Sequence, residues 1–295
     1  MNDALSLLKT TLKEYQRHQS QWLAAAIAYF AVFAIAPLII VVVEIGGFVL
    51  GHHRVLLDEI YGYLRSTAGP GAALAVQSIV RATFNQRHAG IIAQIIAWSI
   101  FVFAAIGLFA SIQQALNTIW DIPPRKKTLG ETIKGRAMSF GVIIIIAAIL
   151  LASLGLNTVL TAAGSALASS FPALPTLMKV IDFVISFAVI AALLALLFEF
   201  LPECKIQWRD VWIGALVTAF LFVIGQFLLG WYLGRAGMGS TYGAFGSLVI
   251  FLLWTNYSAQ IVLFGAEFTH VYAERFGSRR PLEVVSRHPR AQVSQ

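Results

Sequence analysis

The chain has 295 residues, of which 58% are hydrophobic and only 12% are charged. Soluble proteins carry about 25% charged residues, so this composition excludes an ordinary soluble globular domain. The formal net charge of +7 at pH 7 would suit a nucleic-acid ligand, but the placement of the basic residues is better explained by orientation in a membrane.

The first 22 residues form a separate segment with helical periodicity, "ALSLLKTTLKEYQRH". Leu5, Leu8, Leu12 and Tyr15 share one helix face, and the lysines of the segment lie off that face. This pattern predicts a cytoplasmic amphipathic helix on the membrane surface.

Six long apolar runs follow between residues 23 and 275. A helix needs about 20 mostly apolar residues to cross a bilayer, and backbone groups left unpaired in lipid are too costly for any irregular span. The sequence therefore predicts an all-α polytopic membrane protein with six transmembrane helices in one bundle. The predicted spans are residues 23–50, 89–113, 138–161, 178–201, 211–234 and 244–272.

The lysines and arginines favour one orientation, with both termini in the cytoplasm. Fifteen of the 21 basic residues then lie in inner segments, as the positive-inside rule requires. The basic residues of the outer segments are Arg54, Arg65, Arg81, Arg87, Lys179 and Arg235.

Two further segments lie outside the spans. The first outer loop, residues 51–88, has two stretches with helical periodicity, so we expect two short amphipathic helices there. The tail, residues 276–295, is basic and poor in apolar residues, which predicts a flexible cytoplasmic segment. Its charge favours anionic lipid headgroups as partners, and we expect no nucleic acid.

The last predicted span carries a polar stripe. Asn256 and Gln260 are four residues apart, and Gln260 and Glu267 are seven apart, so all three lie on one side of a helix. Polar and ionisable groups inside a membrane face protein or water and not lipid. The stripe either locks helices together by hydrogen bonds or lines a cavity that handles a proton or a substrate.

The first predicted span contains a second unusual pair. Pro37 removes a backbone donor and predicts a kink, and Glu44 follows seven residues later. A kink beside a carboxylate could line the same cavity. The candidate cavity residues are Glu44, Pro37, Tyr242, Gly243, Asn256, Gln260 and Glu267.

Small residues recur at helical spacing and predict close helix packing. They are Gly239, Gly243 and Ser247 near the last span, and Ala24 and Ala28 in the first. Such stripes suit contacts within one chain and contacts between copies in a homo-oligomer equally well. The glycine-rich stretch "GMGSTYGAFG" has a second interpretation, in which backbone N–H groups at a helix start hold an anionic headgroup or substrate.

The sequence gives no support to catalysis. It contains no Walker A motif, no nucleophile elbow and no cluster of carboxylates that resembles a two-metal nuclease. Cys204 is the one cysteine, so no intramolecular disulfide is expected. We expect no enzyme activity, no cofactor and no metal.

Three stretches resemble the YihY/BrkB family of bacterial inner-membrane proteins, which includes the virulence factor BrkB and was formerly labelled ribonuclease BN. They are "AAAIAYFAVFAIAPLIIV", "LPECKIQWRDVWIGALVTAFLF" and "STYGAFGSLVIFLLWTNYSAQIVLFGAEF". The resemblance runs from about Trp22 to Phe276 and implies six spans in the inner membrane, with the first outer loop in the periplasm. Tyr242, Gly243, Trp254, Tyr257, Gly265 and Glu267 match the terminal motif of the family, which has no settled catalytic residues.

The leading functional interpretation is movement of a lipid or another amphipathic envelope-related substrate, without ATP hydrolysis by this chain. The alternative is a membrane scaffold that organises envelope assembly and transports nothing. Metal-dependent RNA cleavage is a third interpretation, which no motif of the chain supports.

Overall fold

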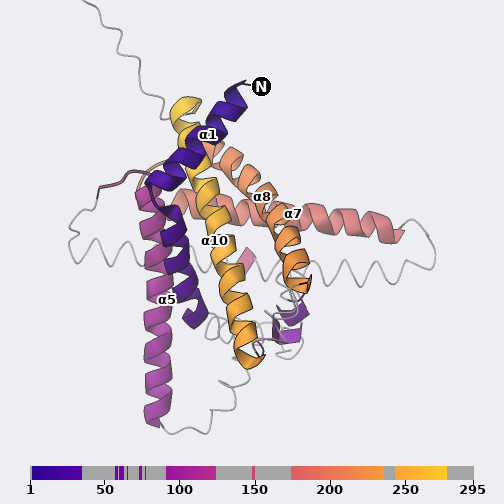
Figure 1. Ribbon diagram of the computed structural model, residues 1–295. Coiled ribbons are helices and arrows are strands. Elements are labelled where there is room, and N and C mark those ends of the chain that lie inside the picture. Colours follow the sequence, from indigo (N-terminus) through magenta and orange to yellow (C-terminus); the bar gives the residue numbers. More distant parts are fainter. Residues whose placement is uncertain are drawn as a thin grey trace, which may run out of the picture.

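The computed structural model describes residues 2–34, 91–123, 174–235 and 243–277, with short helical pieces at 57–58, 60–62, 65, 73–74, 77 and 148–149. Every regular element within these ranges is a helix, which confirms the all-α prediction for this part of the chain. Figure 1 shows the labelled helices in sequence colours. They are α1 (Asn2–Arg17), α5 (Ile91–Ile119), α7 (Leu174–Phe200), α8 (Trp208–Arg235) and α10 (Gly243–Arg275), and a further helix spans Ser20–Ala34.

Three of the described helices are long and apolar enough to cross a membrane. The qualifying segments are Phe183–Phe200 in α7, Trp208–Leu229 in α8 and Leu248–Arg275 in α10. They coincide with the last three predicted spans. Helix α5 covers most of the second predicted span, and Ser20–Ala34 covers the start of the first.

The remaining sequence predictions fall mostly outside the described residues. These are the rest of the first span, the third span at 138–161, most of the first outer loop and the tail beyond residue 277. The described positions of that loop, such as residues 60–62, are helical. A bundle of six spans therefore stays a prediction.

Helix α8 shows why these helices belong in lipid. Trp212, Leu216 and Phe220 follow one another at intervals of four and are 41%, 45% and 59% exposed. The same face continues to Phe227, which is 74% exposed. A water-soluble protein would bury such a stripe, because exposed apolar area is unfavourable in water. Lipid chains remove this cost.

Helix α10 is the common neighbour of the other elements. It packs against α8, α1 and α5, and α7 packs against α8. In Figure 1, α7 runs across α8 and α10, and α1 crosses the C-terminal end of α10. The main buried cluster draws on several helices, with Leu116 of α5, Phe198 of α7, Ala215 of α8 and Leu263 of α10 among its members.

A reciprocal contact of small residues holds α8 against α10. A Cβ atom added at Gly214 of α8 would overlap the side chain of Thr269 on α10, and one added at Gly265 would overlap Thr218 on α8. Each threonine hydroxyl donates to the carbonyl of the glycine four residues before it, Thr218 to Gly214 at 2.6 Å and Thr269 to Gly265 at 2.7 Å. The polar atoms are thus paired within each helix, and the helices can approach closely, which is how helices associate in lipid.

The Ser20–Ala34 helix packs on α5 by a similar device. A Cβ atom at Gly107 would overlap the ring of Phe30. Ala24 and Ala28 of this helix, proposed above as packing residues, are 0% and 1% exposed. The helix therefore presents these two small side chains to the interior.

Candidate functional site

Glu267 is a carboxylate buried inside a membrane-spanning segment. Its residue is 0% exposed, and it lies within Leu248–Arg275 of α10. Its Oε1 accepts a hydrogen bond from Ser20 Oγ at 3.0 Å and lies 2.8 Å from Nδ1 of His18. Its Oε2 is buried and has no hydrogen-bond partner in the described part of the chain. Groups of this kind mark functional sites in membrane proteins more often than they mark stability.

The break between α1 and the next helix delivers both partners to Glu267. Helix α1 ends at Arg17, and Gln19 has a positive φ of 52°. The left-handed conformation is unfavourable for most side chains, but it turns the chain sharply. His18 and Ser20 stand on either side of Gln19, and both reach Oε1 of Glu267.

The end of α5 supplies a second acid to the same place. Ile122 N donates to the Asn117 carbonyl at 2.9 Å, and Asp121 N donates to the Thr118 carbonyl at 3.1 Å. This is a Schellman motif, whose left-handed position is occupied by glycine in most helices. Here Asp121 occupies it with φ 51°. A residue with a carboxylate therefore occupies a backbone conformation that glycine would adopt with less strain.

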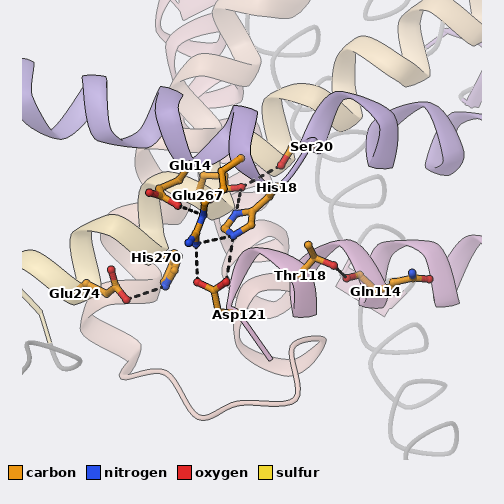
Figure 2. A network of polar contacts seen from close by, with 10 residues as sticks. Glu14, His18, Ser20, Gln114, Thr118, Asp121, Glu267, His270 and Glu274 are labelled. Atoms are coloured by element: carbon orange, nitrogen blue, oxygen red, sulfur yellow. Dashed lines mark hydrogen bonds and ion pairs between the residues drawn. The ribbon is translucent and has the colours of Figure 1, made fainter. Parts of the chain in front are cut away.

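The imidazole of His18 lies between the two acids, as Figure 2 shows. Its Nε2 is 3.4 Å from Oδ1 of Asp121 and 2.9 Å from Nη2 of Arg17. A neutral ring can donate from Nδ1 to Glu267 and accept at Nε2 from Arg17. A protonated ring has no lone pair at Nε2, so it would donate there to Asp121 instead. One proton therefore changes the partner of this ring.

Arg17 connects the acids on the more exposed side of the cluster. Its Nε is 2.6 Å from Oε2 of Glu14, and its Nη2 is 2.8 Å from Oδ2 of Asp121. The cluster, defined as Glu14, Arg17, His18, Ser20, Asp121 and Glu267, holds three carboxyl groups and one permanent cation.

Two pKa shifts outside the spans follow from these contacts. Partial burial alone would raise the pKa of Asp121, but the hydrogen bonds and charges of Arg17 and His18 outweigh it and hold that pKa below its ordinary value. Burial, with a smaller contribution from the charge of Glu267, raises the pKa of the Tyr15 phenol. Asp121 is thus the carboxyl that stays ionised, and Tyr15 stays neutral.

The surroundings of the cluster hold α1 in place. Arg275 of α10 donates from Nη1 to Ser6 Oγ at 2.6 Å, and its Nη2 lies 3.3 Å from Oδ1 of Asp3. The ring of Tyr15 packs on Phe264 with centroids 5.9 Å apart. The first turns of α1 and its residue Tyr15 near the other end therefore both contact α10.

The predicted polar stripe divides into two parts. Gln260 Nε2 donates to Asn256 Oδ1 at 3.4 Å, so these neighbours on α10 contact each other, and both are partly buried. Glu267 contacts His18 and Ser20 instead. All three residues of the stripe lie on α10, but Glu267 contacts residues outside that helix, whereas Asn256 and Gln260 contact each other.

The other candidate residues have the following positions. Gly243 and Ser247 lie in the first turns of α10, where only the backbone is described. Pro37, Glu44, Gly239 and Tyr242 lie outside the described residues, so the proposed cavity between the first and last spans stays a prediction. Within the described residues, no group of three or more histidine, cysteine, aspartate or glutamate side chains could hold a metal ion.

The sequence revealed neither of the two partners of Glu267, His18 and Ser20, nor the second acid, Asp121. These three residues lie outside every predicted span, and none belongs to a known motif. One signal was available, because Asp121 follows a helix directly and precedes Pro123, a position typical of a helix C-terminus. Their meeting depends on tertiary folding over more than one hundred residues, which spacing does not reveal.

Comparison with known proteins gives consistent results. The family profile described as "Virulence factor BrkB" matches residues 11–288. A UPF0761 membrane protein of Verminephrobacter eiseniae is 31% identical over 217 residues, which are 72% of this chain and 49% of that protein. A UPF0761 membrane protein of Pseudomonas paraeruginosa is 26% identical over 289 residues, 95% of this chain and 66% of that protein. This chain thus spans about half to two thirds of the relatives' length, and no solved structure matches it.

Proposed function

Because the chain belongs to the virulence factor BrkB family of membrane proteins, we propose that it moves a lipid or another amphipathic envelope-related substrate across the bilayer, without hydrolysing ATP itself. The basic residues orient the protein with both termini in the cytoplasm of a bacterial cell, in its inner membrane. The cluster around Glu267 then lies toward the cytoplasmic face.

The burial of Glu267 carries this proposal. An ionisable group in a membrane span is expensive, and it persists where function needs a charge or a proton. Glu267 is fully buried in α10, which contacts three other helices, so a change of its charge acts on several elements at once. This is the geometry that a gate coupled to protonation requires.

A gate coupled to protonation also needs a group with two alternative sets of contacts, and the ring of His18 provides one. Its neutral form suits Glu267 and Arg17, and its protonated form suits Glu267 and Asp121. The cluster joins α1, the end of α5 and α10, so a proton that moves between His18 and Glu267 alters the contacts among these three elements. We infer that protonation there is linked to opening of the substrate path.

The backbone supports the same interpretation. Gln19 and Asp121 are the non-glycine residues with positive φ in the described part of the chain. Asp121 belongs to the cluster, and Gln19 stands between its members His18 and Ser20. Strained residues of this kind persist where the surroundings hold them, and they gather at binding sites and switches.

A scaffold without transport is the second candidate, and one observation favours it. Glu267 is paired with His18 and Ser20, and the glycine–threonine contacts seal α8 against α10. A cluster that only locks helices would serve a rigid platform for envelope assembly equally well. Ribonuclease activity forms no part of either proposal.

The experiment is lipid translocation in vesicles that contain the purified protein. Fluorescent phosphatidylglycerol labelled on its headgroup is placed in both leaflets, and dithionite quenches the outer leaflet from outside. Protein that moves the lipid allows quenching to continue past the outer leaflet. We expect Glu267→Gln to slow this phase by roughly tenfold or more, since a charge-assisted hydrogen bond contributes about 1.5–3 kcal/mol.

Glu274→Gln is the matched control, because Glu274 lies on the same helix and its side chain is 56% exposed. It should translocate at the wild-type rate. If wild type moves no labelled lipid, the lipid substrate is wrong. If wild type moves it and Glu267→Gln is equally fast, the role of the carboxylate is wrong and the scaffold interpretation of the cluster gains weight.

A further inference from the structure

Helix α1 presents three different faces. Leu7 and Thr11 are 8% and 0% exposed and form a face turned toward the protein. Leu5, Leu8 and Leu12 form a second face and are 57%, 48% and 51% exposed. Lys9 and Lys13, both exposed, lie on a third face with Thr10. At roughly 100° per residue, the leucine face is turned about a third of a circle from the protein face.

This arrangement differs from that of a helix in water. A surface helix beside a protein core needs one apolar face, and α1 already has it in Leu7 and Thr11. The three exposed leucines form a second apolar face, which covers nothing in the described structure. A helix that lies beside a bundle at a bilayer surface needs all three faces: one for protein, one for lipid and one for water and headgroups.

The contacts of α1 place it at the level of the membrane boundary. Leu7 packs with Phe268 and Val271, and Arg275 holds Ser6 and Asp3. All three α10 residues belong to the last turns of the membrane-spanning segment Leu248–Arg275. Helix α1 crosses this end of α10 in Figure 1. The exposed leucines therefore lie beside the end of a span and not far out in solvent.

We propose that α1 is an interfacial helix whose partner is an anionic lipid surface. Leu5, Leu8 and Leu12 enter the boundary between headgroups and acyl chains, and Lys9 and Lys13 pair with lipid phosphates. Charge complementarity favours lipid over a second protein copy, because lysines border the leucine face and that face carries no acid. Trp22, 68% exposed just beyond α1, is of the type that anchors at this depth.

The depth of the leucine face is measurable by spin labelling. Cys204 is the one cysteine, so Cys204→Ala provides a background for single labels at Leu8→Cys, Leu12→Cys and Thr10→Cys. The protein is placed in vesicles of phosphatidylethanolamine and phosphatidylglycerol. Labels at positions 8 and 12 should relax faster with oxygen, which dissolves in lipid, than with a water-soluble nickel chelate. Thr10→Cys, on the opposite side of α1, should show the reverse order.

The headgroup preference is measured separately with spin-labelled lipids. Wild type should retain phosphatidylglycerol in preference to phosphatidylcholine, and Lys9→Gln with Lys13→Gln should reduce that preference by about fivefold per lysine. Glu203→Gln, at an exposed position in the connection between α7 and α8, serves as the control and should leave the preference unchanged.

Each outcome decides the proposal. Nickel access at positions 8 and 12 equal to that at position 10 would place the leucines in water and overturn it. Loss of access to both reagents, with dipolar broadening, would show a second copy on this face and would also overturn it. An unchanged lipid preference in the double lysine variant would remove the anionic partner. None of these measurements depends on transport, so the proposal stands or falls independently of the proposed function.

Discussion

His18 and Glu267 are 249 residues apart in the chain, yet Nδ1 of one lies 2.8 Å from Oε1 of the other. This contact ties the turn after the N-terminal helix to the last membrane-spanning helix. His18 also faces Asp121 at the end of α5, so one imidazole touches acids from two helices. The members of the cluster differ in burial and in charge, so variants of single members can distinguish a contribution to stability from a contribution to function.

The first prediction concerns the free energy of unfolding. The side chains of His18 and Glu267 are 6% and 0% exposed, so His18→Ala leaves a buried carboxylate without its partner at Nδ1. Removing one partner of a buried pair costs about 3–5 kcal/mol. Glu267→Gln keeps the shape of the side chain and should cost about 1 kcal/mol. Reversible unfolding in mixed detergent micelles measures both values.

A double variant tests whether the two side chains act on each other. His18→Ala should cost far less when position 267 already carries glutamine, because no buried charge is then left alone. The expected coupling is about 0.5–3 kcal/mol. Additive costs would mean that the 2.8 Å contact contributes nothing to stability, and the account of the pair would be wrong.

The second prediction concerns the backbone at Asp121. Its φ of 51° carries a steric cost for any side chain with a Cβ atom. Asp121→Gly and Asp121→Ala both remove the carboxylate, but only glycine relieves this cost. The glycine variant should therefore be the more stable of the two by about 1 kcal/mol. Equal stabilities of the two variants would argue against a left-handed residue at the end of α5.

The third prediction is a pH dependence that also arises from Asp121. Arg17 and His18 hold the pKa of this carboxyl below its ordinary value. The ordinary value for a free aspartate is about 3.9. A carboxyl with a lowered folded pKa contributes stability above its unfolded pKa and loses it as the pH falls through the folded value. Wild type should therefore be more stable than Asp121→Asn near neutral pH, and this advantage should shrink steadily below about pH 4.

The thermal midpoint of unfolding, followed from neutral pH down to pH 2, checks this prediction. Glu274→Gln, the matching change of a carboxyl to an amide at an exposed position of α10, is the control for general acid effects. A constant difference between wild type and Asp121→Asn over the whole range would show that the Asp121 carboxylate does not stabilise the fold.

The fourth prediction concerns the contact between α8 and α10. Gly214→Ala would place a methyl group into the side chain of Thr269, and overpacking of this kind costs about 1–3 kcal/mol. Thr269→Ala removes the obstructing Oγ1 and Cγ2 atoms and keeps Cβ, so the double variant should recover part of the loss. Gly62→Ala is the matched control, because a Cβ atom there meets nothing within 4 Å. Failure of Thr269→Ala to rescue Gly214→Ala would contradict the reciprocal contact.

Much of the helical framework was predictable from the sequence. Long apolar runs identify α7, α8 and α10, because hydropathy is a local property that a span cannot avoid. The leucine pattern of the first segment likewise predicted α1. The prediction for Glu267 as a partnered carboxylate came from the cost of burying a charge in lipid, a physical rule that needs no neighbours.

The partners themselves were beyond sequence reasoning. His18, Ser20 and Asp121 are ordinary polar residues near helix ends. Only the packing of α1 and α5 on α10 brings His18 and Ser20 to Glu267 and Asp121 to His18. The small-residue spacing predicted close packing at Gly239, Gly243 and Ser247, which stays a prediction, and it did not select Gly214 and Gly265, which form a close contact in the structure. Spacing shows that a helix can pack closely, but it does not show which helix it packs against.

The most direct test of a functional role for the buried pair measures transport and stability on the same samples. Wild type, His18→Gln, Glu267→Gln and Glu274→Gln are compared for translocation of labelled phosphatidylglycerol and for the thermal midpoint of unfolding. The account predicts that the first two variants remain folded at the assay temperature but translocate slowly, while Glu274→Gln matches wild type in both measurements. Translocation at the wild-type rate in His18→Gln and Glu267→Gln, or losses that only follow their unfolded fraction, would contradict it and leave the cluster as a lock between helices.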